Sequence, residues 1–202
     1  MKLYYSKGAC SLAVRIIINE LKLDCEFESV NLKEKITETG KNFFEISPKG
    51  AVPTLMLDND EILTENTVIQ QYLADHHKGE KLLPGIENFK RYRVLEWLNY
   101  MTTDVHKSYG PLFNPKVPNE MKQEIFLPNL EAKYDYVNKM LENHDYLLGN
   151  EFTLPDAYLF VTLRWLAAFN IDIKRWSNLE SFFNRLMKRP SIELSMKEEG
   201  LK

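Results

Sequence analysis

The hydrophobic pattern of the chain changes near residue 80, and this change restricts the possible folds more than any other feature. Residues 2–5 and 26–30 have the short aromatic or alternating pattern of β-strands. Residues 11–22, between them, carry apolar side chains at the spacing of a largely buried helix. A strand, a helix and a second strand form a βαβ unit, which predicts parallel pairing of the two strands.

After this unit, the pattern predicts in order a solvated polar loop, a short helix, a hairpin and a longer helix. We expect these elements at residues 31–42, at 42–44, at 52–63 and from residue 64 onward. The hairpin turns at Asn59 and Asp60, two residue types that favour turns. The order β-α-β-α-β-β-α predicts a four-stranded mixed sheet with helices on both sides.

Strand patterns end at a segment that contains Gly79, Pro84 and Gly85, which are typical of a domain boundary. Four helical patterns follow, at residues 89–113, 130–141, 154–169 and 179–187. The sequence therefore predicts an α/β domain over residues 1–79, a linker over 80–86 and an all-helical domain over 87–202.

Composition excludes several classes of function. Lys and Arg number 26 against 29 Asp and Glu, a net charge of −3 that argues against nucleic acid as a partner. No apolar stretch approaches the roughly 18 residues that a membrane helix needs, and polar residues interrupt any signal-peptide core. We therefore expect a cytoplasmic protein with no membrane partner. Two cysteines and four histidines show no metal-ligand spacing, so no metal is expected.

Cys10 is the first candidate for chemistry, because it directly precedes the first predicted helix. The free N–H groups at a helix N-terminus favour a thiolate over a thiol. A buried structural cysteine is an equally good interpretation from position alone. Cys25, at the start of a strand, has no such setting, and we interpret it as structural.

Two backbone positions suggest a ligand site. Val52 precedes Pro53 at the entry to a strand, where a cis bond would leave the Val52 backbone free to pair with an extended peptide ligand. The residues alone leave cis and trans open. Asn66 is a good N-cap, and Glu65 before it could bind a ligand ammonium while helix N–H groups bind a carboxylate. A plain helix cap is the alternative.

In the helical half, Asn99, Thr103 and His106 fall on successive turns of one helix face. Such a stripe is either part of a site or simply faces solvent. Thr153 and Asp156 have the spacing of a capping box at the start of the central helix, which we interpret as structural.

Taken together, these pieces resemble the glutathione S-transferase family, and above all its bacterial beta class, which has a cysteine near the end of the first strand. The matching segments span nearly the whole chain in order: residues 1–12 (MKLYYSKGACSL), 31–32 (NL), 47–55 (SPKGAVPTL), 63–66 (LTEN), 69–75 (IQQYLAD), 96–100 (EWLNY), 106–107 (HK), 152–158 (FTLPDAY) and 189–190 (RP).

The resemblance implies a thioredoxin-like first domain, a helical second domain, a homodimer and glutathione as co-substrate. It implies that Cys10 and His106 lie near the glutathione sulfur and that the Val52 backbone, ahead of a cis Pro53, pairs with the cysteinyl residue. Glu65 and Asn66 would bind the γ-glutamyl head, and Lys35 and Lys107 the glycyl carboxylate. Further contacts would come from Asn99, Thr103 and Asp104, partly of the partner subunit. Where many relatives have Ser or Gly, this chain has Asn66, which could change the grip on the head group.

The activity implied is conjugation of the glutathione thiolate to small hydrophobic electrophiles, as in detoxification. The resemblance implies catalytic roles for Cys10 and His106. The electrophile pocket would be lined by Tyr5, Tyr109, Phe113 and Trp165. One alternative is thiol–disulfide exchange or peroxide reduction, with Cys10 itself as nucleophile. Another is a non-enzymatic module of the same fold that binds hydrophobic ligands or a partner protein.

Overall fold

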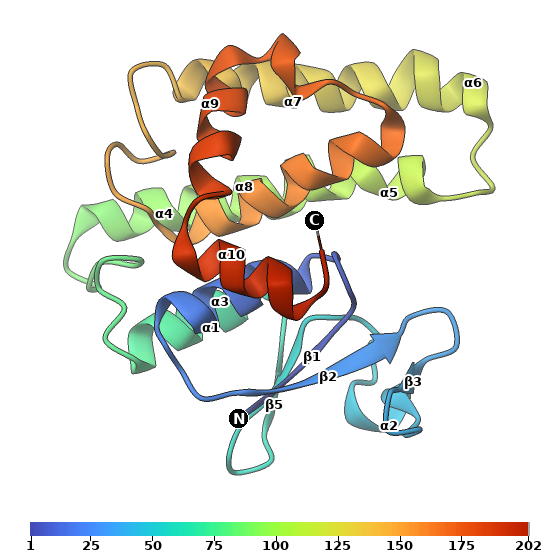
Figure 1. Ribbon diagram of the computed structural model, residues 1–202, viewed down its shortest axis with the longest axis vertical. Helices are drawn as coiled ribbons and strands as arrows, with labels where there is room; N and C mark the ends of the chain where they lie inside the picture. Colours follow the sequence, from blue (N-terminus) through green and yellow to red (C-terminus); the bar gives the residue numbers. More distant parts are fainter. Residues whose placement is uncertain (202) are drawn as a thin grey trace. The chain divides into compact units, whose positions relative to one another are not determined.

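The computed structural model describes residues 1–201, which form two compact units (Figure 1). One unit contains Met1–Leu83 together with the C-terminal residues from Met187 on, and the other is Pro84–Leu186. The sequence predicts a helical domain that runs on to residue 202 and so includes residues from 187 onward. They group with the first unit because the last helix, α10 (Pro190–Glu198), packs against the first helix, α1 (Ser11–Glu20).

The first unit is built on one mixed sheet with the strand order β3-β2-β1-β4-β5. Its strands are β1 (Lys2–Tyr5), β2 (Glu26–Asn31), β3 (Ile36–Thr37), β4 (Thr54–Met56) and β5 (Ile62–Thr64). β1 runs parallel to β2, as the βαβ pattern predicts, and antiparallel to β4, which pairs antiparallel with β5 in the expected hairpin. The mixed sheet is thus confirmed.

The sheet has five strands rather than the expected four. The additional strand, β3, is two residues long and pairs antiparallel with β2 inside the segment predicted to be a loop. Two residues are too few to give an alternating pattern. Side chains fix the segment instead, since the buried Glu28 carboxylate accepts a hydrogen bond from Thr39, whose hydroxyl also contacts Thr37.

Three helices belong to the sheet: α1, α2 (Phe43–Ile46) and α3 (Asn66–His76). α1 contacts β1, α3 and α10, so most of its side chains are buried, including three consecutive isoleucines. This contact on several sides explains why its sequence is apolar nearly all round.

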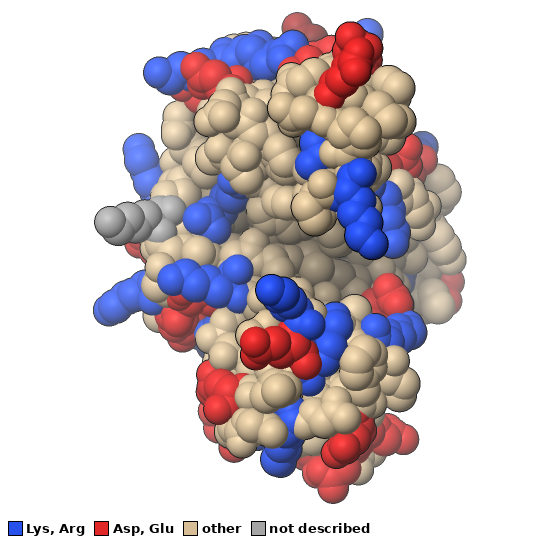
Figure 2. Space-filling view, turned by 90° about the vertical axis from the view of Figure 1, so that its right-hand side faces the viewer, with Lys and Arg blue, Asp and Glu red and all other residues tan. Residues whose placement is uncertain are grey.

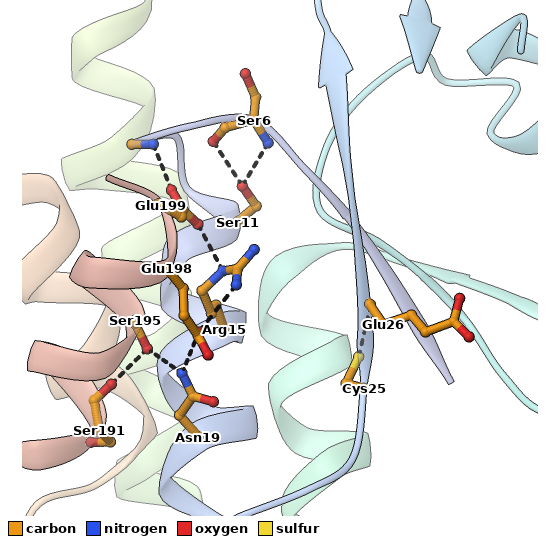
Figure 3. Close-up of polar contacts among 11 residues, drawn as sticks. Ser6, Ser11, Arg15, Asn19, Cys25, Glu26, Ser191, Ser195, Glu198 and Glu199 are labelled. Carbon is orange, nitrogen blue, oxygen red and sulfur yellow. Dashed lines mark hydrogen bonds and ion pairs between the residues drawn. The ribbon is translucent and has the colours of Figure 1, made fainter. Parts of the chain in front are cut away.

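Polar contacts join α10 to α1 (Figure 3). Arg15, which is 2% exposed, lies at the centre and forms ion pairs with Glu198 and Glu199. Asn19, one turn further along α1, donates to Ser195 and to Glu198 at 2.9 Å each. Charged groups thus hold the end of the chain to the helix that begins after Cys10.

The second unit is helical throughout its regular structure. Its elements are α4 (Phe89–Tyr100), a π-helical segment (Met101–His106), α5 (Lys107–Phe113), α6 (Asn119–Met121), a π-helical segment (Lys122–Phe126), α7 (Leu127–Met140), α8 (Leu154–Arg164), 3₁₀ turns (Trp165–Phe169 and Ile173–Arg175) and α9 (Ser177–Leu186). The four predicted helical regions are present. α8 is buried along almost its whole length, and Thr153 and Asp156 form the capping box at its start.

Charged side chains of both signs are interspersed on the face shown in Figure 2, which agrees with the balanced composition. Within residues 1–201, no helix combines the length and the apolar character that a bilayer crossing requires.

Candidate functional site

Cys10 lies at the N-cap position of α1, immediately before Ser11. Its backbone carbonyl accepts the Ala13 N–H at 3.1 Å, the first hydrogen bond of the helix. Its thiol donates to the backbone carbonyl of Val52 at 3.3 Å. The partly buried sulfur is therefore held beside the segment that enters β4.

Burial raises the pKa of the Cys10 thiol to about 11. The backbone N–H groups of Cys10 and Ser11 and the side chain of Asn66 act in the opposite direction, but they do not offset the loss of solvation. Burial thus outweighs the helix N-terminus, which by itself favours a thiolate. With this raised pKa, Cys10 is a neutral hydrogen-bond donor at pH 7.

The Val52–Pro53 peptide bond is cis. Val52 is half-buried, and Thr54 fixes the turn before β4 by donating to the Ala51 carbonyl at 2.9 Å. Lys35 donates to the carbonyl of Gly50 at 2.7 Å. The ammonium group of Lys35 is thus anchored two residues before Val52, on the same turn.

Glu65 and Asn66 differ from their expected arrangement. The sequence predicts Asn66 as the N-cap of α3, but the helix begins at Asn66 and Glu65 holds the N-cap position with φ 71°. The 7% exposed side chain of Asn66 faces inward, and its Nδ2 donates to the Cys10 carbonyl at 2.6 Å. The Asn66 amide is therefore bound to the cysteine segment, whereas Glu65 is exposed and accepts from Lys49 at 2.6 Å.

These contacts gather one part of the expected site. Cys10 is hydrogen-bonded to both Val52 and Asn66, and Glu65 adjoins Asn66 in the chain. Tyr5 belongs to the same unit but contacts Arg15, whose guanidinium lies 4.4 Å from the centre of the Tyr5 ring. Burial raises the pKa of the Tyr5 hydroxyl, so it is a neutral group.

A second group of expected residues lies on the Met101–His106 segment and the helix before it. Thr103 donates to the Asn99 carbonyl at 3.0 Å and to Asp104 at 2.8 Å. Asp104 also accepts from Lys133 of α7 at 3.2 Å. The hydrogen bonds from Thr103 and Lys133 hold the Asp104 pKa below its usual value.

His106 has other partners than this group. Its Nδ1 lies 2.6 Å from the Tyr158 hydroxyl of α8, and its ring lies 4.9 Å from the Trp165 ring. Burial, and then the neighbouring charge of the exposed Lys107, lower the His106 pKa to about 4. The imidazole is therefore neutral at pH 7. The expected common face for Asn99 and His106 assumed α-helical spacing, whereas π-helical bonds run from i to i+5.

The three aromatic residues expected to line an electrophile pocket in this unit are in mutual contact. Trp165 lies edge-on to Tyr109 at 5.1 Å and to Phe113 at 5.9 Å. Tyr109 is fully buried, and its hydroxyl donates to the Thr162 carbonyl at 2.8 Å. Tyr109 is thus a core residue, and Phe113 and Trp165 are the accessible members of this cluster.

Residues 1–201 contain no group of three or more His, Cys, Asp or Glu side chains that could hold a metal ion.

Sequence reasoning missed four residues that contact the expected ones: Lys49, Gln70, Tyr158 and Lys133. Gln70 follows Asn66 by four residues, so helical spacing alone could have paired them. Tyr158 and Lys133 come from distant helices, and nothing in the sequence indicated their partners.

Two family models match most of the chain: the glutathione S-transferase N-terminal domain over residues 4–81 and its C-terminal domain over residues 100–190. The chain is 41% identical to glutathione S-transferase GstA of Escherichia coli O157:H7, over the full length of both proteins.

Solved structures agree with these matches. A sphingomonad glutathione S-transferase complexed with glutathione has a TM-score of 0.95 at 36% identity, covering all of both chains. The bacterial beta-class glutathione S-transferase of Sphingomonas chungbukensis gives the same TM-score, identity and coverage. Sequence and fold together show that the chain belongs to the glutathione S-transferase family and resembles its bacterial beta class.

Proposed function

We propose that the chain conjugates glutathione to small hydrophobic electrophiles, as a homodimeric, cytoplasmic detoxification enzyme. The observation that carries the proposal is the arrangement in which Cys10 is hydrogen-bonded to both Val52 and Asn66, next in the chain to the exposed carboxylate of Glu65, which is paired with Lys49. A family member with this cysteine setting has the parts needed to hold a γ-glutamyl-cysteinyl peptide.

Glutathione binding is proposed to use one group for each part of the tripeptide. The Val52 backbone pairs with the cysteinyl residue, as an extended ligand pairs with a sheet edge. The Glu65 carboxylate takes the γ-glutamyl ammonium, and the first N–H groups of the eleven-residue helix α3 favour its carboxylate. Lys35, anchored at Gly50, and Lys107 are assigned to the glycyl carboxylate.

The chemistry proposed is displacement by the glutathione thiolate. The thiol loses its proton to solvent, the sulfur forms a bond to the electrophilic carbon, and the leaving group departs with its electron pair. The neutral Cys10 thiol suits a donor to the glutathione sulfur, which would stabilise the anion. The same raised pKa weighs against Cys10 as the attacking nucleophile, and hence against thiol–disulfide exchange as the main activity.

From the family resemblance, we propose that His106 is a second hydrogen-bond donor to the glutathione sulfur. If the Tyr158 hydroxyl donates to Nδ1, the neutral imidazole carries its proton on Nε2 and can donate there without bearing a charge. Phe113 and Trp165 offer accessible apolar surface for an electrophile.

A homodimer is proposed on the same resemblance, in which Asn99, Thr103 and Asp104 act partly across the subunit boundary. The start of α4 supports it, because Phe89 and Tyr92 are 68% and 52% exposed and offer apolar surface of the kind that interfaces cover.

Calorimetric titration with glutathione tests the binding assignment. Glu65→Gln should weaken binding about tenfold, the effect of losing one hydrogen bond to a charged group. Glu61→Gln, an exposed acid at the turn between β4 and β5, is the matched control and should bind like the parent chain. Equal affinity for all three proteins, or no binding by the parent chain, would refute the proposal.

A further inference from the structure

A chain of two side-chain amides leads from the interior of α3 to Cys10. Gln70 is fully buried, and its Nε2 donates to Asn66 Oδ1 at 2.5 Å. Asn66 Nδ2 in turn donates to the Cys10 carbonyl at 2.6 Å. Both side chains belong to α3, and Asn66 is the one that contacts the residue preceding α1.

We propose that Gln70 and Asn66 are positioning residues, which act as a relay that fixes the backbone carbonyl of Cys10 and through it the place of the thiol. The inference deepens the proposed function and rests on it for its catalytic meaning. The hydrogen bonds themselves join Gln70 to Asn66 and Asn66 to Cys10, whatever reaction the chain performs.

The direction of the relay follows from its acceptors. A side-chain amide has one oxygen and one NH₂ group, and the Cys10 carbonyl can only accept, so the Asn66 nitrogen faces that carbonyl. The Asn66 oxygen then accepts from the Gln70 nitrogen. Without that donor, the Asn66 oxygen would lose this partner, and the Asn66 side chain would be held less firmly against the Cys10 carbonyl.

The surroundings of Gln70 support a role beyond filling space. Its Oε1 is buried and has no hydrogen-bond partner within residues 1–201. An unpaired buried amide oxygen is unfavourable, and an apolar side chain of the same length would avoid that cost. The feature that an apolar side chain would lack is the N–H donated to Asn66.

The position of the Cys10 carbonyl affects both the start of α1 and the Cys10 thiol. The carbonyl also accepts the Ala13 N–H, so it fixes the first turn of α1, and the thiol of the same residue donates to Val52. The Asn66 side chain lowers the pKa of the Cys10 thiol against the effect of burial. Releasing Asn66 should therefore decrease the thiolate fraction of Cys10 at any given pH.

Alkylation of Cys10 by iodoacetamide at pH 9 tests the relay in a Cys25→Ser background, with no need for glutathione. Gln70→Met, Asn66→Ala and the double variant form a cycle. Gln71→Met is the matched control, because it places the same substitution on the next residue of α3, whose amide donates to the Thr67 carbonyl at 3.1 Å instead. Circular dichroism checks that each variant folds.

Gln70→Met should slow alkylation about twofold, because half a pKa unit lowers the thiolate fraction about threefold and the higher nucleophilicity compensates in part. Gln71→Met should leave the rate unchanged. In the Asn66→Ala background, adding Gln70→Met should have no further effect on the alkylation rate, because the Asn66 amide through which Gln70 acts is already absent. A Gln70→Met rate that is unchanged or raised, or effects of the two substitutions that multiply independently, overturns the inference.

The two proposals fail in different ways. Loss of the proposed function appears as absent glutathione binding or conjugation in the parent chain. Loss of the relay appears in the alkylation cycle, whatever the parent chain does with glutathione. In conjugation assays, the relay predicts that Gln70→Met lowers kcat while the KM for glutathione stays unchanged, because Gln70 acts on the thiol and not on the head-group contacts.

Discussion

Replacing Glu199 by glutamine should destabilise the first unit, because this substitution removes one charge from a buried ion pair. The Glu199 side chain is 0% exposed. It accepts from Arg15 Nε at 3.1 Å and from the Gly8 N–H at 2.8 Å. Glu199→Gln keeps the shape but only one of the two acceptor oxygens. It therefore removes the charge and, if its oxygen stays on Gly8, turns an NH₂ group toward Arg15.

The structure sets the expected magnitude. Removing one partner of a buried pair typically costs about 3–5 kcal/mol, because the remaining charge is left without compensation. Arg15 keeps a second partner, Glu198, at 3.1 Å. Since the glutamine oxygen can still accept from Gly8, we expect a loss of about 2 kcal/mol, below that range. For a chain of this size, that loss lowers Tm by about 4–8 °C.

Urea unfolding at one fixed protein concentration measures this loss. Glu198→Gln is the control, because the Glu198 side chain is 33% exposed and its pair with Arg15 is partly screened by solvent. The control should lose about 1 kcal/mol or less. Equal losses for the two variants, or no loss for Glu199→Gln, would refute the reasoning that burial makes the Glu199 pair the stronger one.

Three further predictions concern ionisation. Cys10 should react with iodoacetamide at pH 7 about 20-fold more slowly than an ordinary thiol, because its raised pKa reduces the thiolate more than higher nucleophilicity compensates; an equal or faster rate would contradict this. ¹⁵N NMR should show His106 neutral down to a midpoint near pH 4, and stability should fall as pH drops below about 6.5, because only the unfolded state then takes up that proton; a midpoint above 6 would contradict burial as the cause. Burial raises the Glu20 pKa, but the hydrogen bonds from Arg189 outweigh this effect, and the pKa lies below its usual value. Arg189→Met should therefore be less stable than the parent chain at pH 7, and this difference in stability should disappear as acid protonates Glu20. A difference that persists at pH 2 would show that the ion pair is not its cause.

Patterns that repeat along the chain made most of the fold predictable. The βαβ unit, the hairpin and the four helical regions each have a hydrophobic period that survives in the structure. β3 could not be seen, because two residues carry no period. The placement of α10 could not be seen either, since the Arg15 contacts join residues more than 180 positions apart.

The site was predictable where the family motif names a residue and less so where contacts decide its state. The motif names Cys10 and Val52, but it did not predict the hydrogen bond between them. The Cys10 pKa likewise depends on how far burial outweighs the helix N–H groups. Asn66 matched a good N-cap by type, yet the nearby Cys10 carbonyl and Gln70 amide take its side chain instead. Neither balance can be read from residue order.

The most direct test of the central claim is the rate of glutathione conjugation to a chlorodinitrobenzene-type electrophile, measured for the parent chain and Cys10→Ala side by side. The parent chain should conjugate, and Cys10→Ala should keep roughly a tenth of the rate or more, because it loses one hydrogen bond to the sulfur and not the nucleophile. No conjugation by the parent chain, or complete loss in Cys10→Ala, would contradict the account.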